Sequence, residues 1–338
     1  MVVPMTSGGS GESAHQPHDG LFRRVFGDPK HAGSELRSVL SAEVAAHIDL
    51  EHLEPVAASF VDDYLSQVHS DLLFRTTFDG DDAYLYFLIE HQSSPDDLMA
   101  FRMLRYQVRI WERHLKTEPT TSGKTGLPMI VPVVLYQGHR RWTAPTDIAD
   151  IIKVSDHAAT AFADLLPHVR YILDDLTVVD EAAMRARPLT PAARIAALLL
   201  GPASKDADVT TTLRASLDDW QTVADTEPAL LVVFFTYLLI VGETQADDIT
   251  HFAAQLGQEA KEAAVTTAQR LRQEGIEQGI SQGISLGQSQ LLVAMLEARF
   301  GELDNDTRLR IEHATASQIA DWSTRFARGA NSISAVVD

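Results

Sequence analysis

Two strand-like runs separated by a turn sequence constrain the fold of this chain more than any other feature. The first run is Asp71–Phe78 and the second is Tyr84–His91, and both are rich in β-branched, aromatic and other apolar residues. Between them lies Asp79–Asp82, with the sequence Asp-Gly-Asp-Asp, which is typical turn chemistry. The pattern predicts a β-hairpin.

The segments around this hairpin alternate between helical and strand-like patterns. In chain order, we expect a helix over residues 31–47, a short strand over 56–60, the hairpin, a long helix over 95–116 and a buried strand over 129–136. The long helix carries an apolar stripe that we expect to face the core, formed by Phe101, Leu104, Val108, Trp111 and Leu115. The order predicts an α/β domain with a mixed sheet.

The hairpin brings two carboxylates together. If the turn is centred between Gly80 and Asp81, then Asp71 lies directly opposite Glu90. Residues paired in this way have Cβ atoms about 4.5–5.5 Å apart. Two carboxylates that close repel one another unless a cation lies between them or one is protonated. A shared Mg²⁺ would satisfy both, because Mg²⁺ often takes one or two carboxylates. The alternative is a pair of surface acids in a different register.

Two further residues are candidates for the same site. Gln92 lies two residues after Glu90, so its position is on the same face of the strand, and its amide could orient a water or a phosphate oxygen. Asp71, Glu90 and Gln92 have the spacing of a site where a metal activates water beside a phosphodiester. Glu43 lies on the otherwise apolar face of the first helix. Either it joins the metal ligands or it reaches solvent at the edge of that face.

The long helix also carries a basic stripe. Its five cations are Arg102, Arg105, Arg109, Arg113 and Lys116, at spacings of 3, 4, 4 and 3 residues. The net charge of −19 argues against nucleic-acid binding. However, residues 18–141 carry 13 Lys+Arg and 18 Asp+Glu, a net of −5, whereas the rest of the chain carries −14. The stripe is therefore typical of a surface that binds the phosphate backbone of DNA. Such contacts give affinity without sequence specificity. A solvated helix face, or pairing with the acidic C-terminal region, is the alternative.

The C-terminal region has a helical pattern broken by prolines. Its most apolar stretch, Ala229–Gly242, is shorter than the ~20 residues of a membrane span, and we expect a buried core helix. Further on, glycine recurs every fourth residue, at Gly275, Gly279, Gly283 and Gly287. Each glycine costs a helix about 1 kcal/mol. The segment is therefore either a flexible helical linker or a helix through which the chain forms a homo-oligomer.

These patterns divide the chain into five expected parts. They are a flexible tail over residues 1–14, the α/β domain over 15–145, a helical domain over 146–256, a Gly- and Gln-rich helical segment over 257–290, and a helical hairpin over 291–338 with its turn near Gly301. There is no cysteine, which excludes disulfides and thiolate metal sites and fits a reducing compartment. We expect a soluble, cytoplasmic protein without a membrane span.

Several stretches resemble the recombination-promoting nuclease (Rpn) family of the PD-(D/E)XK superfamily, a family also described as transposase-like. The matching stretches are His18–Arg23, Ser70–Leu73, Leu88–Ser94, Phe101–Tyr106 and Pro132–Gly138. Glu-His-Gln-Ser, at residues 90–93, is the most distinctive of them. The resemblance covers residues 15–145 and extends more weakly to the glycine repeat.

This resemblance implies a PD-(D/E)XK-type core and a DNA endonuclease that uses Mg²⁺ or Mn²⁺ to hydrolyse phosphodiester bonds and promotes DNA recombination. Asp71 and Glu90 would hold the metal, and Gln92 would stand where most of the superfamily has lysine. Glutamine lacks the charge with which lysine stabilises a phosphorane-like state. His18 and Asp19 match a family motif, and we expect a structural hydrogen bond there. The alternative class is a weak or inactive nuclease fold that acts as a DNA- or protein-binding module.

Overall fold

The chain divides into two units, residues 1–267 and 268–338. The computed structural model describes residues 12–56, 71–90, 95–117, 126–138, 140–201, 209–242 and 244–337. The boundary expected near residue 145 lies inside the first unit, and the tail expected over residues 1–14 gives way to a helix at Glu12. In the described part of the chain, no helix has both the length and the apolar character needed to cross a membrane.

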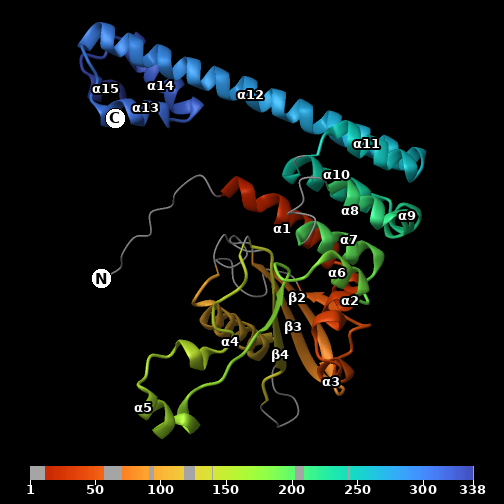
Figure 1. Cartoon of the computed structure of the whole chain (residues 1–338). Coiled ribbons are helices and arrows are strands. Elements are labelled where there is room, and N and C mark those ends of the chain that lie inside the picture. The colour runs from red at the N-terminus through yellow and green to blue at the C-terminus, as the bar shows by residue number, and fades with distance from the viewer. Residues whose placement is uncertain are drawn as a thin grey trace. The chain divides into compact units, whose positions relative to one another are not determined.

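The first unit contains a mixed five-stranded sheet (Figure 1). Its strands, in spatial order, are β1 (Glu54–Val56), β2 (Asp71–Phe78), β3 (Asp81–Glu90), β4 (Met129–Tyr136) and β5 (Ile172–Asp175). The first three strands are antiparallel neighbours, whereas β4 is parallel to β3 and β5 is parallel to β4. The predicted hairpin, the strand over residues 129–136 and the α/β class with a mixed sheet are confirmed.

The register of the hairpin differs from the expected one by two residues. Asp71 pairs with Leu88 rather than with Glu90. The reason lies in the turn, where Asp79 and Gly80 both have positive φ angles, of 50° and 89°. These two residues, and not Gly80 and Asp81, occupy the central positions, as the Asp-Gly preference of a tight hairpin turn requires.

One face of the sheet is covered by α4 (Met99–Thr117). The side chains of α4 that pack against the sheet are Met99, Met103, Tyr106 and Ile110, which share a buried cluster with Leu73, Tyr84, Val134 and Tyr136. Of the apolar stripe expected to face the core, only Leu104 and Trp111 pack against this cluster, and they are half-buried. The rest of that prediction is wrong, because Phe101 is 48% exposed and Leu115 is 49% exposed. The helix carries two apolar stripes of similar spacing, so periodicity alone did not distinguish the buried one.

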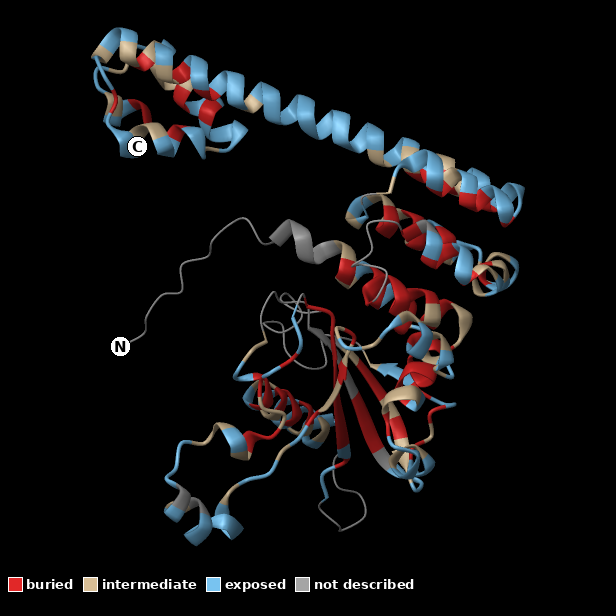
Figure 2. Ribbon diagram, in the orientation of Figure 1, coloured by how far each residue is buried: buried red, intermediate tan, exposed pale blue. Residues whose placement is uncertain are grey.

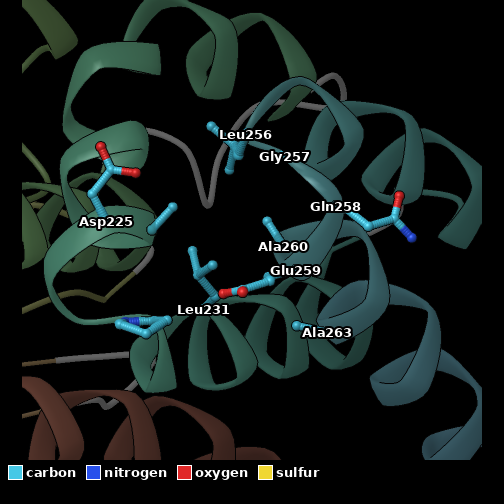
Figure 3. Close-up of a pocket in the computed structure, with 10 residues that line it drawn as sticks. Asp225, Leu231, Leu256, Gly257, Gln258, Glu259, Ala260 and Ala263 are labelled. Carbon is cyan, nitrogen blue, oxygen red and sulfur yellow. The ribbon is translucent and has the colours of Figure 1, made fainter.

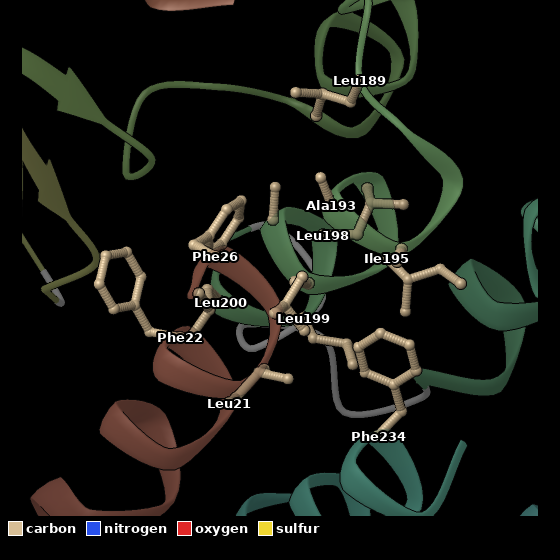
Figure 4. Close-up of a cluster of buried hydrophobic side chains, with 14 of the residues drawn as sticks. Leu21, Phe22, Phe26, Leu189, Ala193, Ile195, Leu198, Leu199, Leu200 and Phe234 are labelled. Atoms are coloured by element: carbon tan, nitrogen blue, oxygen red, sulfur yellow. The ribbon is translucent and has the colours of Figure 1, made fainter. Parts of the chain in front are cut away.

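The opposite face of the sheet is covered by a larger helical layer. Its main members are α1 (Glu12–Phe26), α2 (Pro29–Val39), α7 (Pro191–Leu200) and α10 (Ala229–Val241). Figure 4 shows Phe22 and Phe26 of α1 close to Leu199 and Leu200 of α7, in one cluster that also contains Phe234 of α10. The prediction of a buried helix over 229–242 is confirmed. This core joins segments that the sequence assigned to separate domains.

The helix expected over residues 31–47 is two helices. The first, α2, ends at Val39, and α3 (Ala42–His47) begins after Ser41, whose hydroxyl accepts a hydrogen bond from the Val44 amide at 3.2 Å. Because of this break, Glu43 belongs to α3 and does not continue the apolar face of α2. Glu43 is exposed.

The rest of the first unit is mostly helical, as expected, apart from β5. Its other described helices are η2 (Ile148–Ile151), α5 (Asp156–Ala161), η3 (Ala163–Leu165), α6 (Glu181–Ala186), α8 (Val209–Ala215), α9 (Leu217–Thr226) and α11 (Ala246–Gln255).

A long helix, α12 (Gln258–Phe300), passes from the first unit into the second. Figure 2 shows the middle of α12 as exposed, and residues 272–284 are all exposed. The helix ends at Gly301, whose φ is 93°, and three short helices follow, α13 (Asn305–Glu312), α14 (Ala316–Ala327) and α15 (Ile333–Val337). The turn predicted near Gly301 is confirmed, but the expected hairpin is wrong. The small core of this unit includes Leu296, Ile311 and Trp322.

Candidate functional site

Asp71 and Glu90 lie at the same end of the hairpin. Asp71 is the first residue of β2 and Glu90 is the last residue of β3, which runs antiparallel to it. Because Asp71 pairs with Leu88, and Glu90 is two residues further along, both positions are on the same face of the sheet. Residues in this diagonal relation are about 7–8 Å apart. The register thus keeps the two positions together, although they are not directly paired. Gln92 and His91 lie outside the described residues.

The face that carries these positions is the one covered by α4. Leu73 and Tyr84 share this face by the alternation of β2 and β3, and both belong to the cluster around α4. The C-terminal half of α4 lies at the opposite end of the sheet, because Tyr84 Oη is 3.3 Å from His114 Nδ1. The N-terminal half of α4 is therefore the part that approaches the Glu90 end.

Two residues on neighbouring strands lie in the same row as Glu90. Glu90 pairs with Tyr136 of β4, which in turn pairs with Asp175 of β5. The Asp175 carboxylate accepts hydrogen bonds from the amide of Trp142 at 2.9 Å and from the amide and hydroxyl of Thr177 at 2.9 and 2.6 Å. Asp175 thus fixes the chain around the end of β5. Asp175 was not predicted as a site residue, although Ile172–Asp175, a short apolar run that ends in two aspartates, was the available signal.

Glu43 lies at the other end of the sheet. Ile48, which follows α3, forms a bridge with Phe78 at the end of β2, and His47 Nδ1 is 2.8 Å from Asp79 Oδ1 in the hairpin turn. Strand β2 has eight residues, so this end is roughly 20 Å from Asp71. Of the two alternatives for Glu43, the structure shows the solvent-exposed one, and we leave Glu43 out of the candidate site.

The basic stripe lies along the solvent side of α4. Arg105, Arg109, Arg113 and Lys116 are exposed, whereas Arg102 is half-buried. Arg102 pairs with Asp96 at 2.8 Å, and Arg109 pairs with Glu112 at 3.2 Å. Both of these partners are close in sequence, and neither belongs to the acidic C-terminal region. The stripe begins at the end of α4 that approaches Glu90.

His18 forms a structural hydrogen bond between helices. Its Nδ1 atom is 2.9 Å from the hydroxyl of Tyr237 in α10, and that hydroxyl is 3.2 Å from the carbonyl oxygen of Leu199 in α7. Burial raises the pKa of Tyr237, which keeps the hydroxyl neutral. The bond is of the structural kind that we expected, but it joins α1 to α10 instead of lying at a helix start. Asp19 is half-exposed beside it.

Two clefts in the first unit are poor candidates for binding a phosphate. Figure 3 shows the first, of about 310 Å³, where α9, α10 and the start of α12 meet. Its charged lining residues are the acids Asp225 and Glu259. The second cleft, of about 590 Å³, is lined by Lys30 and Arg37. These cations already pair with Glu227 and Glu51, respectively. Within the described ranges, no group of three His, Asp or Glu side chains is placed to hold a metal.

The chain is similar to proteins of one family over most of its length. A family model described as "Putative transposase, YhgA-like" matches residues 16–199. The chain belongs to this family. The match covers the whole sheet together with α4, α6 and α7, and so includes both Asp71 and Glu90. No solved structure is significantly similar to the chain.

Three relatives from Escherichia coli (strain K12) illustrate the range of the family. The chain is 30% identical to recombination-promoting nuclease RpnC over 77% of this chain and 82% of that protein. It is 30% identical to recombination-promoting nuclease RpnA, over 79% of this chain and 87% of RpnA. It is also 29% identical to the inactive recombination-promoting nuclease-like protein RpnE, over 84% of this chain and 91% of RpnE. Family membership alone therefore does not decide activity.

Proposed function

We propose that this protein is a metal-dependent DNA endonuclease of low sequence specificity that promotes recombination, with a PD-(D/E)XK-type core. The observation that carries the proposal is the placement of Asp71 and Glu90 on one sheet face, at one end of the hairpin. Two relatives of similar length, named recombination-promoting nucleases, support it. The sheet, flanked by α1 and α2 on one face and α4 on the other, is the scaffold expected for such a core.

The chemistry of the donor set fits a small divalent cation. Asp71 and Glu90 would hold Mg²⁺ or Mn²⁺, because Mg²⁺ commonly uses one or two carboxylates and fills its other positions with water and phosphate oxygens. When bound, the metal would supply charge stabilisation and a more acidic water. Gln92 would position the water or a phosphate oxygen, without the charge of a lysine.

In the proposed reaction, a water oxygen forms a bond to phosphorus while the bond from phosphorus to the leaving sugar oxygen breaks. The water loses a proton to solvent and the leaving oxygen takes one up, so the step needs no further co-reactant. The basic stripe would hold the DNA backbone along α4, since four of its five cations are solvent-exposed and its first member lies toward the Glu90 end.

The test is plasmid cleavage by the purified protein with Mg²⁺, Mn²⁺ or EDTA. We expect nicking or linearisation that requires the metal, and its loss in Asp71→Ala and in Glu90→Ala. The matched control is Glu43→Ala, which removes an exposed acid at the far end of β2 and should cleave like the wild type. Cleavage by the Asp71 and Glu90 variants at the wild-type rate would refute the proposal.

A nuclease fold that binds DNA or protein without cutting is the second candidate, and the inactive relative RpnE favours it. Metal dependence of stability separates the two functions. A site that holds two repelling acids gains stability from Mg²⁺, because the ion binds the folded state alone. If Mg²⁺ leaves the unfolding temperature unchanged and no cleavage occurs, the binding module becomes the better explanation.

A further inference from the structure

The carboxyl ends of three parallel strands lie at one edge of the sheet. Strands β3, β4 and β5 are parallel neighbours, and their last residues, Glu90, Tyr136 and Asp175, pair in one row. Neighbouring strands are about 4.8 Å apart, so the loop that leaves β4 begins beside Glu90. In open α/β sheets, ligands bind in the crevice outside the carboxyl ends of the strands. The loop after β4 is therefore placed to contact a ligand that binds at the Glu90 end.

Hydrogen bonds fix both ends of the loop between Tyr136 and Trp142. At its start, the Leu176 amide donates to the carbonyl oxygen of Tyr136 at 2.9 Å. At its end, the Trp142 amide donates to Oδ2 of Asp175 at 2.9 Å, and the Trp142 ring packs on the Tyr136 ring with 4.8 Å between their centroids. Because both rings belong to the cluster around α4, the loop returns on the α4 side of the sheet. This is the side that carries the two candidate carboxylate positions.

Two consecutive arginines, Arg140 and Arg141, are exposed in this loop. They directly precede Trp142, whose amide is held by Asp175. Unlike Arg102 of α4, neither arginine pairs with an acid among the described residues. In a chain of net charge −19, two adjacent cations without an acidic partner are available to an anion from outside the chain. The two ends of their loop are held about 5 and 10 Å from the Glu90 row position, one and two strands away.

The candidate site needs a positive charge that its own residues do not supply. Two carboxylates balance the charge of one Mg²⁺, and Gln92 is neutral. A phosphodiester brings a further negative charge, and more negative charge develops in the transition state. We propose that Arg140 and Arg141 bind the non-bridging oxygens of the phosphodiester at the cleavage position and supply this charge, an inference that rests on the proposed nuclease function. Each guanidinium group presents N–H donors in a planar fork that matches two phosphate oxygens.

The experiment replaces both arginines by Gln and, separately, both by Lys in the full chain. Arg140→Gln with Arg141→Gln should lower kcat for plasmid cleavage by about 10–100-fold, because it removes donors to the transition state. Arg140→Lys with Arg141→Lys retains the charge and loses only the fork, so it should keep most of kcat. All these positions are exposed, so each variant should unfold at the wild-type temperature.

The matched control is Arg214→Gln with Lys261→Gln. These cations are exposed in α8 and α12, and their replacement changes the net charge by the same amount. The control should cleave DNA like the wild type, because neither residue lies in the loop after β4.

Binding of a short DNA duplex in EDTA adds a readout that does not depend on catalysis. Loss of two phosphate contacts should reduce the slope of log affinity against log salt by about 2, since each contact contributes about 0.9. The double Lys variant should keep the wild-type slope, because its cations still neutralise the phosphates. Fluorescence anisotropy at several salt concentrations measures both slopes.

Three results would overturn the proposal for Arg140 and Arg141. They are wild-type kcat in the double Gln variant, an equal loss in the control pair, and a loss in the double Lys variant as large as that in the double Gln variant. If the wild type itself cuts no DNA, the proposed function fails separately. The two arginines are then judged by duplex binding alone. Weaker binding by the double Gln variant than by the control retains the phosphate contact, and equal binding excludes it.

Discussion

Glu35 is a fully buried acid in α2 that shares one cation with a second acid. Arg187 donates two hydrogen bonds of 2.7 Å to Asp174 and lies 3.4 Å from Glu35 Oε1. The other oxygen of Glu35 has no hydrogen-bond partner in the described part of the structure. Burial, followed by the charge of Asp174, raises the pKa of Glu35 well above its ordinary value of 4.5, and Arg187 only partly offsets this rise.

We predict that Glu35→Gln removes a pH-dependent loss of stability. In the folded protein Glu35 stays protonated to a higher pH than in the unfolded chain, where it ionises near 4.5. Between these two pKa values the folded state binds more protons, so the free energy of unfolding falls as the pH rises. The glutamine side chain of the variant cannot ionise. The stability gain of the variant over wild type should therefore be small near pH 4.5 and grow toward neutral pH.

Urea unfolding at about pH 5 and about pH 8 measures this difference. Glu54→Gln is the control, because Glu54 is exposed in β1 and the same chemical change there should shift stability equally at both pH values. An equal stability difference for Glu35→Gln at the two pH values would contradict the prediction.

The site residues show what local pattern can and cannot predict. Asp71 and Glu90 were predicted to share a face, and they do, because an error of two residues in register preserves the alternation of a strand. Glu43 was ambiguous, because its placement depended on a helix break at Ser41 that the apolar pattern did not reveal.

At the level of elements, the pattern predicted where strands and helices lie in the chain. It predicted less well the register between the paired strands and the side of α4 that is buried. The hairpin register depended on which two residues occupy the turn, and the Asp79-Gly80 pair carried that information. For α4, both apolar stripes have helical spacing, and only contact with the sheet shows that the stripe containing Met103 and Tyr106 is the buried one. The exposed stripe leaves the basic face beside it open to solvent.

We predict that the basic stripe determines the salt dependence of DNA binding. Replacing Arg105, Arg109, Arg113 and Lys116 together by Gln should weaken binding to duplexes of any sequence. It should also reduce the slope of log affinity against log salt by about 3–4, since each phosphate contact contributes about 0.9. Arg102 is left in place because, unlike the other four, it is half-buried beside Asp96. Fluorescence anisotropy over salt concentrations of roughly 50 to 300 mM is the measurement.

The control for the stripe is a variant with the same change in net charge elsewhere. Lys261, Arg270, Arg272 and Arg328 are exposed and lie outside α4, so their replacement by Gln tests long-range charge alone. If both fourfold variants lose the same slope, binding would follow from overall charge, and the solvated-face alternative for the stripe would be the better one.

At the scale of the whole molecule, long-range contacts unite segments that the sequence separated. Strand β5 joins the sheet from within the region expected as a helical domain, and α7 and α10 share one core with α1 and α2. Neither contact could be predicted from the local sequence pattern. Strand β5 has only four residues, and α10 is apolar on nearly every side, so its pattern does not show which side faces the core. Composition and periodicity predict the local structure of a segment. Which other segment packs against its apolar face can be seen only in the complete fold.

The middle of α12 carries four exposed glycines next to three exposed isoleucines. A Cβ atom added at Gly275, Gly279, Gly283 or Gly287 would meet no atom within 4 Å. Beside these glycines, Ile276, Ile280 and Ile284 are about half exposed. Four glycines cost a helix about 4 kcal/mol, and a close helix from a second chain would offset this cost by packing a ridge of isoleucines into a groove of glycines.

We therefore predict that the chain self-associates through this part of α12. Gly279→Leu combined with Gly283→Leu fills the groove and should reduce the mass found by sedimentation equilibrium to that of one chain, while raising helicity. Gln278→Leu with Gln282→Leu is the matched control, because these exposed positions are rotated by about 100° from the glycines, away from the isoleucines. It should keep the wild-type mass. A wild type that already sediments as one chain would instead identify the segment as a helical linker, because the groove would then have no partner.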